Sequence, residues 1–153
     1  MNAYLWIKLV HILSATLLFG TGIGTAFFML KAYLSGNEEA MRITSKAVVM
    51  ADWLFTTPAV VVQLATGLWL TARLGIPFDS AWFASVLALY IFVGACWLPV
   101  VWIQIRVRNL LANGAARDSY SAMMRVWMAL GVPAFAAVAV LIFLMVSKAG
   151  AWP

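Results

Sequence analysis

The chain has 153 residues, 65% of them hydrophobic, and a formal net charge of +5. This length allows one compact bundle and no second domain, and a mean hydropathy of +0.99 excludes an ordinary water-soluble protein. The ten Lys and Arg residues stand beside apolar blocks rather than in one basic patch, so the positive charge does not indicate nucleic-acid binding.

Four apolar blocks follow one another along the chain, at about Tyr4–Leu34, Val48–Arg73, Trp82–Val107 and Met124–Ser147. A helix of about 20 apolar residues crosses the hydrocarbon core of a bilayer, so each block is long enough. None of them alternates polar and apolar residues as a membrane β-strand does, and a helix satisfies its own backbone hydrogen bonds in lipid. The sequence therefore predicts an all-α fold, an integral membrane, antiparallel four-helix bundle that occupies residues 1–153 as one domain.

The distribution of basic residues predicts which side of the membrane each loop occupies. The first and third connections and their flanks carry Lys31, Arg42, Lys46, Arg106, Arg108, Arg117 and Arg125. The opposite side carries only Lys8, Arg73 and Lys148. By the positive-inside rule, the first and third loops lie in the cytoplasm and both termini lie outside.

The first block holds the only histidine of the chain, His11. Helical periodicity puts His11 on one face with Ser14 and Ala15, and this face points into the bundle because polar groups in lipid are costly. Two interpretations stay open. His11 is an axial ligand of a haem iron, or it forms a structural hydrogen bond across the bundle to Gln63 or Tyr90.

Small residues and prolines interrupt the blocks near the middle of the membrane. Gly20 and Gly24 have the spacing that lets two helices approach closely, which makes them candidates for a homodimer contact. Pro58, Pro99 and Pro133 each remove one backbone hydrogen bond and predict kinked helices. The kinks either form a partly polar cavity at mid-bundle or simply set how the helices pack.

Asp52 lies about one turn inside the cytoplasmic boundary of the second block, and an ionisable group inside a membrane is a candidate for function. We expect it to be charged and to form a buried ion pair with Arg106 or Arg125. A role in proton handling is the alternative.

The depth of several side chains favours a porphyrin site. His11, Gln63, Tyr90 and Met145 are expected at one level of the bundle, where His11 and Met145 are chemically competent axial ligands of haem b. Tyr90 and the aromatic Trp97 would flank the macrocycle. The leading hypothesis is therefore a membrane protein that binds haem b or a porphyrin and has a redox role.

Two other functions stay open, because no catalytic triad, phosphate-binding loop or zinc-ligand set is present in the sequence. The first is a non-enzymatic interaction protein or small subunit, which dimerises through Gly20 and Gly24. The second is an oligomeric transporter for a small solute or ion.

Several segments resemble the bacterial membrane family known as domain of unknown function 2269: residues 4–13 (YLWIKLVHIL), 51–58 (ADWLFTTP), 96–101 (CWLPVV) and 103–106 (IQIR). The resemblance covers essentially the whole chain and implies four spans in a bacterial inner membrane. The opening pattern LW-K--H is also similar to HemJ-type protoporphyrinogen oxidases, which bind haem b through a first-helix histidine. On that resemblance only His11 carries over. The HemJ-type third helix bears a lysine that residues 82–105 lack, so whether the protein is an enzyme stays open.

Overall fold

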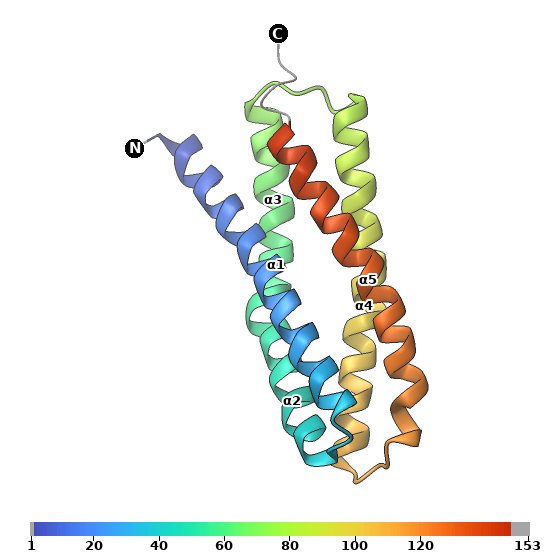
Figure 1. Ribbon diagram of the computed structural model, residues 1–153. Coiled ribbons are helices and arrows are strands. Elements are labelled where there is room, and N and C mark those ends of the chain that lie inside the picture. Colours follow the sequence, from blue (N-terminus) through green and yellow to red (C-terminus); the bar gives the residue numbers. More distant parts are fainter. Residues whose placement is uncertain (1, 148–153) are drawn as a thin grey trace.

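The computed structural model describes residues 2–147, which form helices joined by three short loops (Figure 1). The elements are α1 (Ala3–Leu34), α2 (Glu38–Ala51), the π-helical turn η1 (Asp52–Thr56), α3 (Thr57–Arg73), α4 (Ala81–Ala112) and α5 (Asp118–Ser147). Since α2, η1 and α3 form one continuous rod, the protein has four long apolar helices. No strand occurs among the described residues. The all-α four-helix bundle predicted from the sequence is confirmed.

The helices are longer than the apolar blocks because capping residues start them in polar sequence. The second rod begins at Glu38 rather than Val48, where the Asn37 side chain accepts a hydrogen bond from the Ala40 N–H at 3.0 Å. Glu38 and Glu39 in its first turn complement the positive end of the helix dipole. Helix α5 likewise begins in polar sequence before its apolar block, with Asp118 in its first turn.

Each connection contains a glycine with a positive φ, a backbone conformation that side chains disfavour. These are Gly36, Gly75 and Gly114, with φ of 69°, 67° and 73°. The tight turns keep sequential helices antiparallel. Ala3 and Ser147 consequently lie at one end of the bundle, and the basic residues of the first and third connections lie at the other (Figure 1). Lys148 is outside the described residues.

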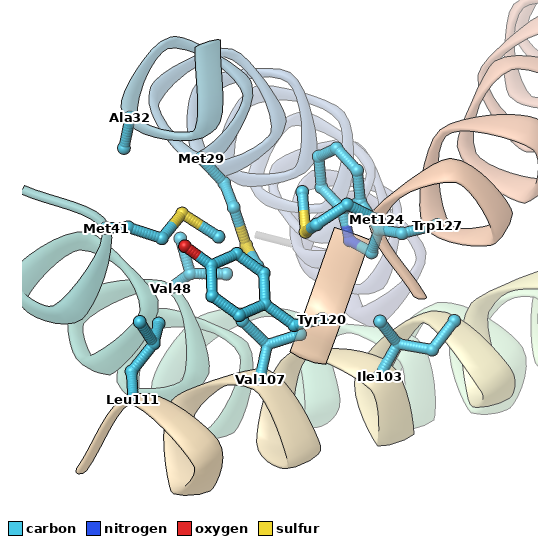
Figure 2. Close-up of a cluster of buried hydrophobic side chains, with 10 residues drawn as sticks. All are labelled: Met29, Ala32, Met41, Val48, Ile103, Val107, Leu111, Tyr120, Met124 and Trp127. Carbon is cyan, nitrogen blue, oxygen red and sulfur yellow. The ribbon is translucent and has the colours of Figure 1, made fainter. Parts of the chain in front are cut away.

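The apolar core occupies only the end with the first and third loops. It is made of Met29, Ala32, Met41, Val48, Ile103, Val107, Leu111, Tyr120, Met124 and Trp127, and Figure 2 shows side chains from four helices meeting there. At the opposite end most residues of all four helices are exposed or only partly buried. We call these two ends the packed end and the open end. Lipid covers such an open surface in a membrane protein.

The open end consists of two helix pairs, α1 with α3 and α4 with α5. In Figure 1 α1 runs obliquely across α3, and its first turns stand apart from the other helices. Contacts between α1 and α5 occur farther down, where the rings of Phe19 and Phe135 meet edge to face at 6.3 Å between centroids. The Tyr90 hydroxyl joins the pairs by donating to the Val60 carbonyl at 2.9 Å.

The prolines act differently in the three rods that contain them. Just before Pro58 the helix widens into the π-turn η1, in which the Thr57 N–H donates to the Asp52 carbonyl. A proline has no N–H and its ring crowds the carbonyl four residues earlier, which accounts for a widened turn there. Pro99 and Pro133 lie inside uninterrupted helices, and α5 bends near its middle, the part that holds Pro133 (Figure 1).

Candidate functional site

A network of hydrogen-bonded polar side chains joins α1 to α3 within the open end. His11 Nδ1 lies 2.8 Å from Thr66 Oγ1, and His11 Nε2 lies 3.1 Å from Gln63 Nε2. The Ser14 hydroxyl donates to Gln63 Oε1 and is also 2.9 Å from the His11 carbonyl. We call these four residues (His11, Ser14, Gln63 and Thr66) the polar latch. The contact between His11 and Gln63 was one of the two interpretations that the sequence left open.

The hydrogen-bond partners of His11 favour one tautomer of the imidazole. Thr66 gives its single hydroxyl proton to the Val62 carbonyl at 2.6 Å, so its oxygen accepts from His11. In this arrangement the proton of the ring is on His11 Nδ1. Since the Gln63 amide N–H₂ is a donor, His11 Nε2 accepts from it through its lone pair. This arrangement suits a neutral imidazole whose Nε2 lone pair faces the side-chain amide of Gln63.

Gly67 makes room for the imidazole ring. A Cβ built at this position would lie 3.2 Å from His11 Cε1, closer than ordinary van der Waals contact. The ring therefore packs directly against the backbone of α3. Small residues at a helix interface allow this close approach in membranes.

The other proposed porphyrin contacts have no described hydrogen bond to the latch. Tyr90, on α4, is bonded to the Val60 carbonyl. Met145 is 40% exposed near the end of α5, ten residues beyond Phe135, where α1 and α5 meet. Among the described residues, no hydrogen bond or ring contact links Met145 to the latch.

The structure does not bring Asp52 together with either predicted arginine. The Asp52 side chain is buried and accepts a hydrogen bond from the Thr56 hydroxyl at 3.0 Å, and within residues 2–147 no cation lies within ion-pair distance of it. Arg106 and Arg125 are exposed, and the Arg106 guanidinium lies over the Trp102 ring. Long basic side chains reach outward to the interface rather than inward, which explains why the pair does not form.

Two shallow grooves lie along the lipid-facing seam between α1 and the second rod. One, of about 310 Å³, is lined by Thr25, Phe28, Ile43, Thr44, Ala47, Val48 and Ala51. The other, of about 230 Å³, includes Ser14 of the latch and Pro58. Both are mainly apolar. Within the described part of the chain, no group of three or more His, Cys, Asp or Glu residues could hold a metal ion.

The family of the chain follows from a comparison with protein-family models. The model described as "Predicted integral membrane protein (DUF2269)" matches residues 5–149. The chain belongs to this family. The match spans all four long helices and includes the latch residues of both α1 and α3. No curated protein and no solved structure matches.

The sequence placed His11 and Ser14 on an inward face and indicated Gln63 as a partner, but it did not single out Thr66 or Gly67. The available signal was their spacing, since Gln63, Thr66 and Gly67 follow at intervals of three and four residues on one face of α3. That spacing shows which residues share a face of α3. It does not show which residue of α1 lies opposite.

A glycine substitution tests the latch. In Gly67→Ala the new methyl group displaces the His11 ring and strains its bonds to Thr66 and Gln63, so we expect a loss of about 1–2 kcal/mol in the free energy of unfolding. Gly94→Ala is the matched control, because a Cβ there meets nothing within 4 Å. The control should be neutral or stabilising by up to about 1 kcal/mol, since alanine favours helix over glycine. The measurement is unfolding in detergent followed by circular dichroism, and equal effects of the two substitutions would contradict the assignment.

Proposed function

We propose that this member of the DUF2269 family binds haem b or a related porphyrin in the membrane, with His11 Nε2 as ligand of the iron, and has a redox role. The observation that carries the proposal is the bonding of the imidazole. Nδ1 lies 2.8 Å from the Thr66 hydroxyl and Nε2 lies 3.1 Å from the Gln63 amide nitrogen, an arrangement that fits a proton on Nδ1 and a lone pair on Nε2. Histidines that bind metals are typically held this way, with the other ring nitrogen donating to an oxygen that fixes the tautomer.

The residues of the latch fit this role by their donor chemistry. Thr66 orients the ring and Gly67 leaves space for it against α3. Gln63 has to turn aside to free Nε2, and its carbonyl oxygen retains Ser14 as a donor. When bound, haem would supply the electron transfer, while the chain holds the ring and excludes water. The open end and its exposed apolar side chains provide a surface against which an apolar macrocycle can lie.

An absorption spectrum of the purified protein tests the proposal. Protein from haem-replete cells should show a Soret band that His11→Gly abolishes and that added imidazole restores. Restoration of the band by imidazole would show that the variant still folds and lacks only the ligand of the iron. Gln63→Leu, which removes the competing amide, should retain the band. A colourless wild-type preparation from such cells would refute haem binding at His11.

A second candidate function is a non-enzymatic membrane subunit that dimerises through Gly20 and Gly24. The supporting observation is that a Cβ built at either glycine meets nothing within 4 Å, so this close-packing spacing is not used inside the chain. Gly22, between them, faces inward instead, 3.2 Å from the Phe135 ring by the same construction. Transport by several assembled copies stays a prediction.

A bulky substitution at Gly24 tests whether the protein dimerises through Gly20 and Gly24. Gly24→Ile should convert a dimer to a monomer in lipid nanodiscs, because the isoleucine prevents close approach of the second helix. Gly94→Ile is the control, since position 94 on α4 is equally unobstructed within the chain. The measurement is single-molecule photobleaching or crosslinking. A dimer that survives Gly24→Ile would place the contact elsewhere, and a monomeric wild type would remove this candidate.

We further propose that the packed end faces the cytoplasm, with both termini outside in a bacterial inner membrane. The support is the concentration of basic residues at that end. In a Cys96→Ala background, Asp79→Cys should react with a membrane-impermeant maleimide added to intact cells, and Glu38→Cys should react only after lysis. Both positions are exposed in loops or at a helix start. The reverse labelling pattern would invert the orientation.

A further inference from the structure

The larger of the two grooves lies where the last part of α1 packs on α2, within the packed end (Figure 1). Two bulky side chains line it, Phe28 on α1 and Ile43 on α2, and they are 64% and 57% exposed. Ala47 and Ala51 on α2 line it as well. Since these alanines are small, the space of about 310 Å³ between the two helices is not filled by the chain itself.

The groove has the length and the depth of an acyl chain in one leaflet. From Ile43 to Ala51 the helix rises by eight residues, or about 12 Å, and half of the hydrocarbon core is about 15 Å thick. Ile43 lies five residues after Glu38, where α2 begins, so the groove starts about 8 Å from the helix end. At about that depth the polar interface of a bilayer gives way to hydrocarbon.

Two exposed lysines flank the groove. Lys31 follows Phe28 by three positions, and Lys46 follows Ile43 by three, so each lysine shares a helix face with a bulky lining residue. Side chains on a helix lean toward its N-terminus. Because α1 and α2 are antiparallel, Lys31 leans toward the middle of the membrane and Lys46 toward the packed end. The electrostatic interaction of Lys46 with Glu39, two turns nearer the packed end, agrees with this direction.

The chain does not neutralise these two lysines. Within residues 2–147, no carboxylate lies within ion-pair distance of Lys31 or Lys46. Glu39 is held by both of its oxygens to Arg42, so its charge is already compensated. The Thr44 hydroxyl, which lines the groove, makes no hydrogen bond to a described residue. This end of the groove therefore offers two cations and a hydroxyl donor to an anionic group rich in oxygen.

We propose that the groove binds one anionic phospholipid of the leaflet at the packed end, with an acyl chain along the groove and the phosphate between Lys31 and Lys46. The Thr44 hydroxyl donates to an oxygen of the headgroup or of the ester. A zwitterionic lipid fits less well because its own ammonium competes with the lysines. A second copy of the chain docked through the same surface would bring its lysines against these, and like charges repel. The site does not depend on haem binding, since the polar latch lies in the open end.

Native mass spectrometry of the full chain, released from detergent, tests the charged part of the site. The probes are dioleoyl phosphatidylglycerol, which is anionic, and dioleoyl phosphatidylcholine, which has the same chains. We expect the first bound lipid to be phosphatidylglycerol by about tenfold or more, since each lysine near an anionic headgroup contributes about fivefold. Lys31→Gln and Lys46→Gln should each lower this preference by about fivefold. Arg106→Gln and Arg125→Gln, which remove the same charge from the same end on α4 and α5, should change it little.

A second comparison tests the apolar part of the site. Ala47→Phe places a ring in the groove and should weaken phosphatidylglycerol binding severalfold, whereas Ala88→Phe, at an exposed position on α4, should not. Glycerol phosphate, which has the charge but no chains, should not displace the lipid at equal concentration. All the substituted side chains are exposed, and circular dichroism verifies that each variant is folded.

Four results would each overturn the proposal. They are equal binding of the two lipids to the wild type, lysine variants that behave like the arginine controls, an Ala47→Phe variant that binds like the wild type, and displacement of the lipid by glycerol phosphate.

Discussion

The middle of a bilayer holds no water, so each polar group that the helices carry into it must be satisfied within the protein. The backbone is satisfied by helix formation. Many side-chain hydroxyls are satisfied within their own helix, as Thr25 donates to the Thr21 carbonyl and Thr71 to the Gly67 carbonyl. Such residues need no partner from another helix, and they cost the fold little.

Groups that cannot bond within their own helix determine where the helices must meet. An imidazole, a primary amide, a carboxyl group and an indole N–H are of this kind. His11 and Gln63 satisfy each other across the seam between α1 and α3. By contrast, Asp52, Gln104 and Trp127 each have one buried atom without a hydrogen-bond partner among the described residues. The same physical requirement is thus met at the latch, whereas these three atoms have no partner among the described residues.

The two ends of the bundle are packed by different kinds of contact. The packed end contains methionine, valine, leucine and aromatic side chains that fill the space among the rods, and it needs no polar contacts to do so. The open end has few buried side chains, and its rods are held together by individual interactions such as Tyr90 to Val60. A region held by few contacts is the part of a bundle in which helices can shift to admit a ligand or a partner.

The sequence by itself determined that the protein has four membrane-spanning helices, because length and hydropathy are sufficient for that inference in lipid. It also determined which face of each helix is polar, including the faces that carry His11, Asp52 and Gln63, since helical periodicity depends on spacing within one segment. The early start of the second rod was missed because residues 38–46 are mostly polar. Capping by Asn37, rather than hydropathy, starts that helix.

Only the tertiary structure decided which residues of different helices meet. It paired His11 with Thr66 and Gln63, placed Gly67 under the ring, and left Asp52 without an arginine. The expectation of an ion pair rested on Asp52, Arg106 and Arg125 sharing one end of the bundle, yet the two arginines point outward there. The physical reason is that depth along a helix follows from counting residues, whereas the rotation of one helix against another follows from how all their side chains pack together.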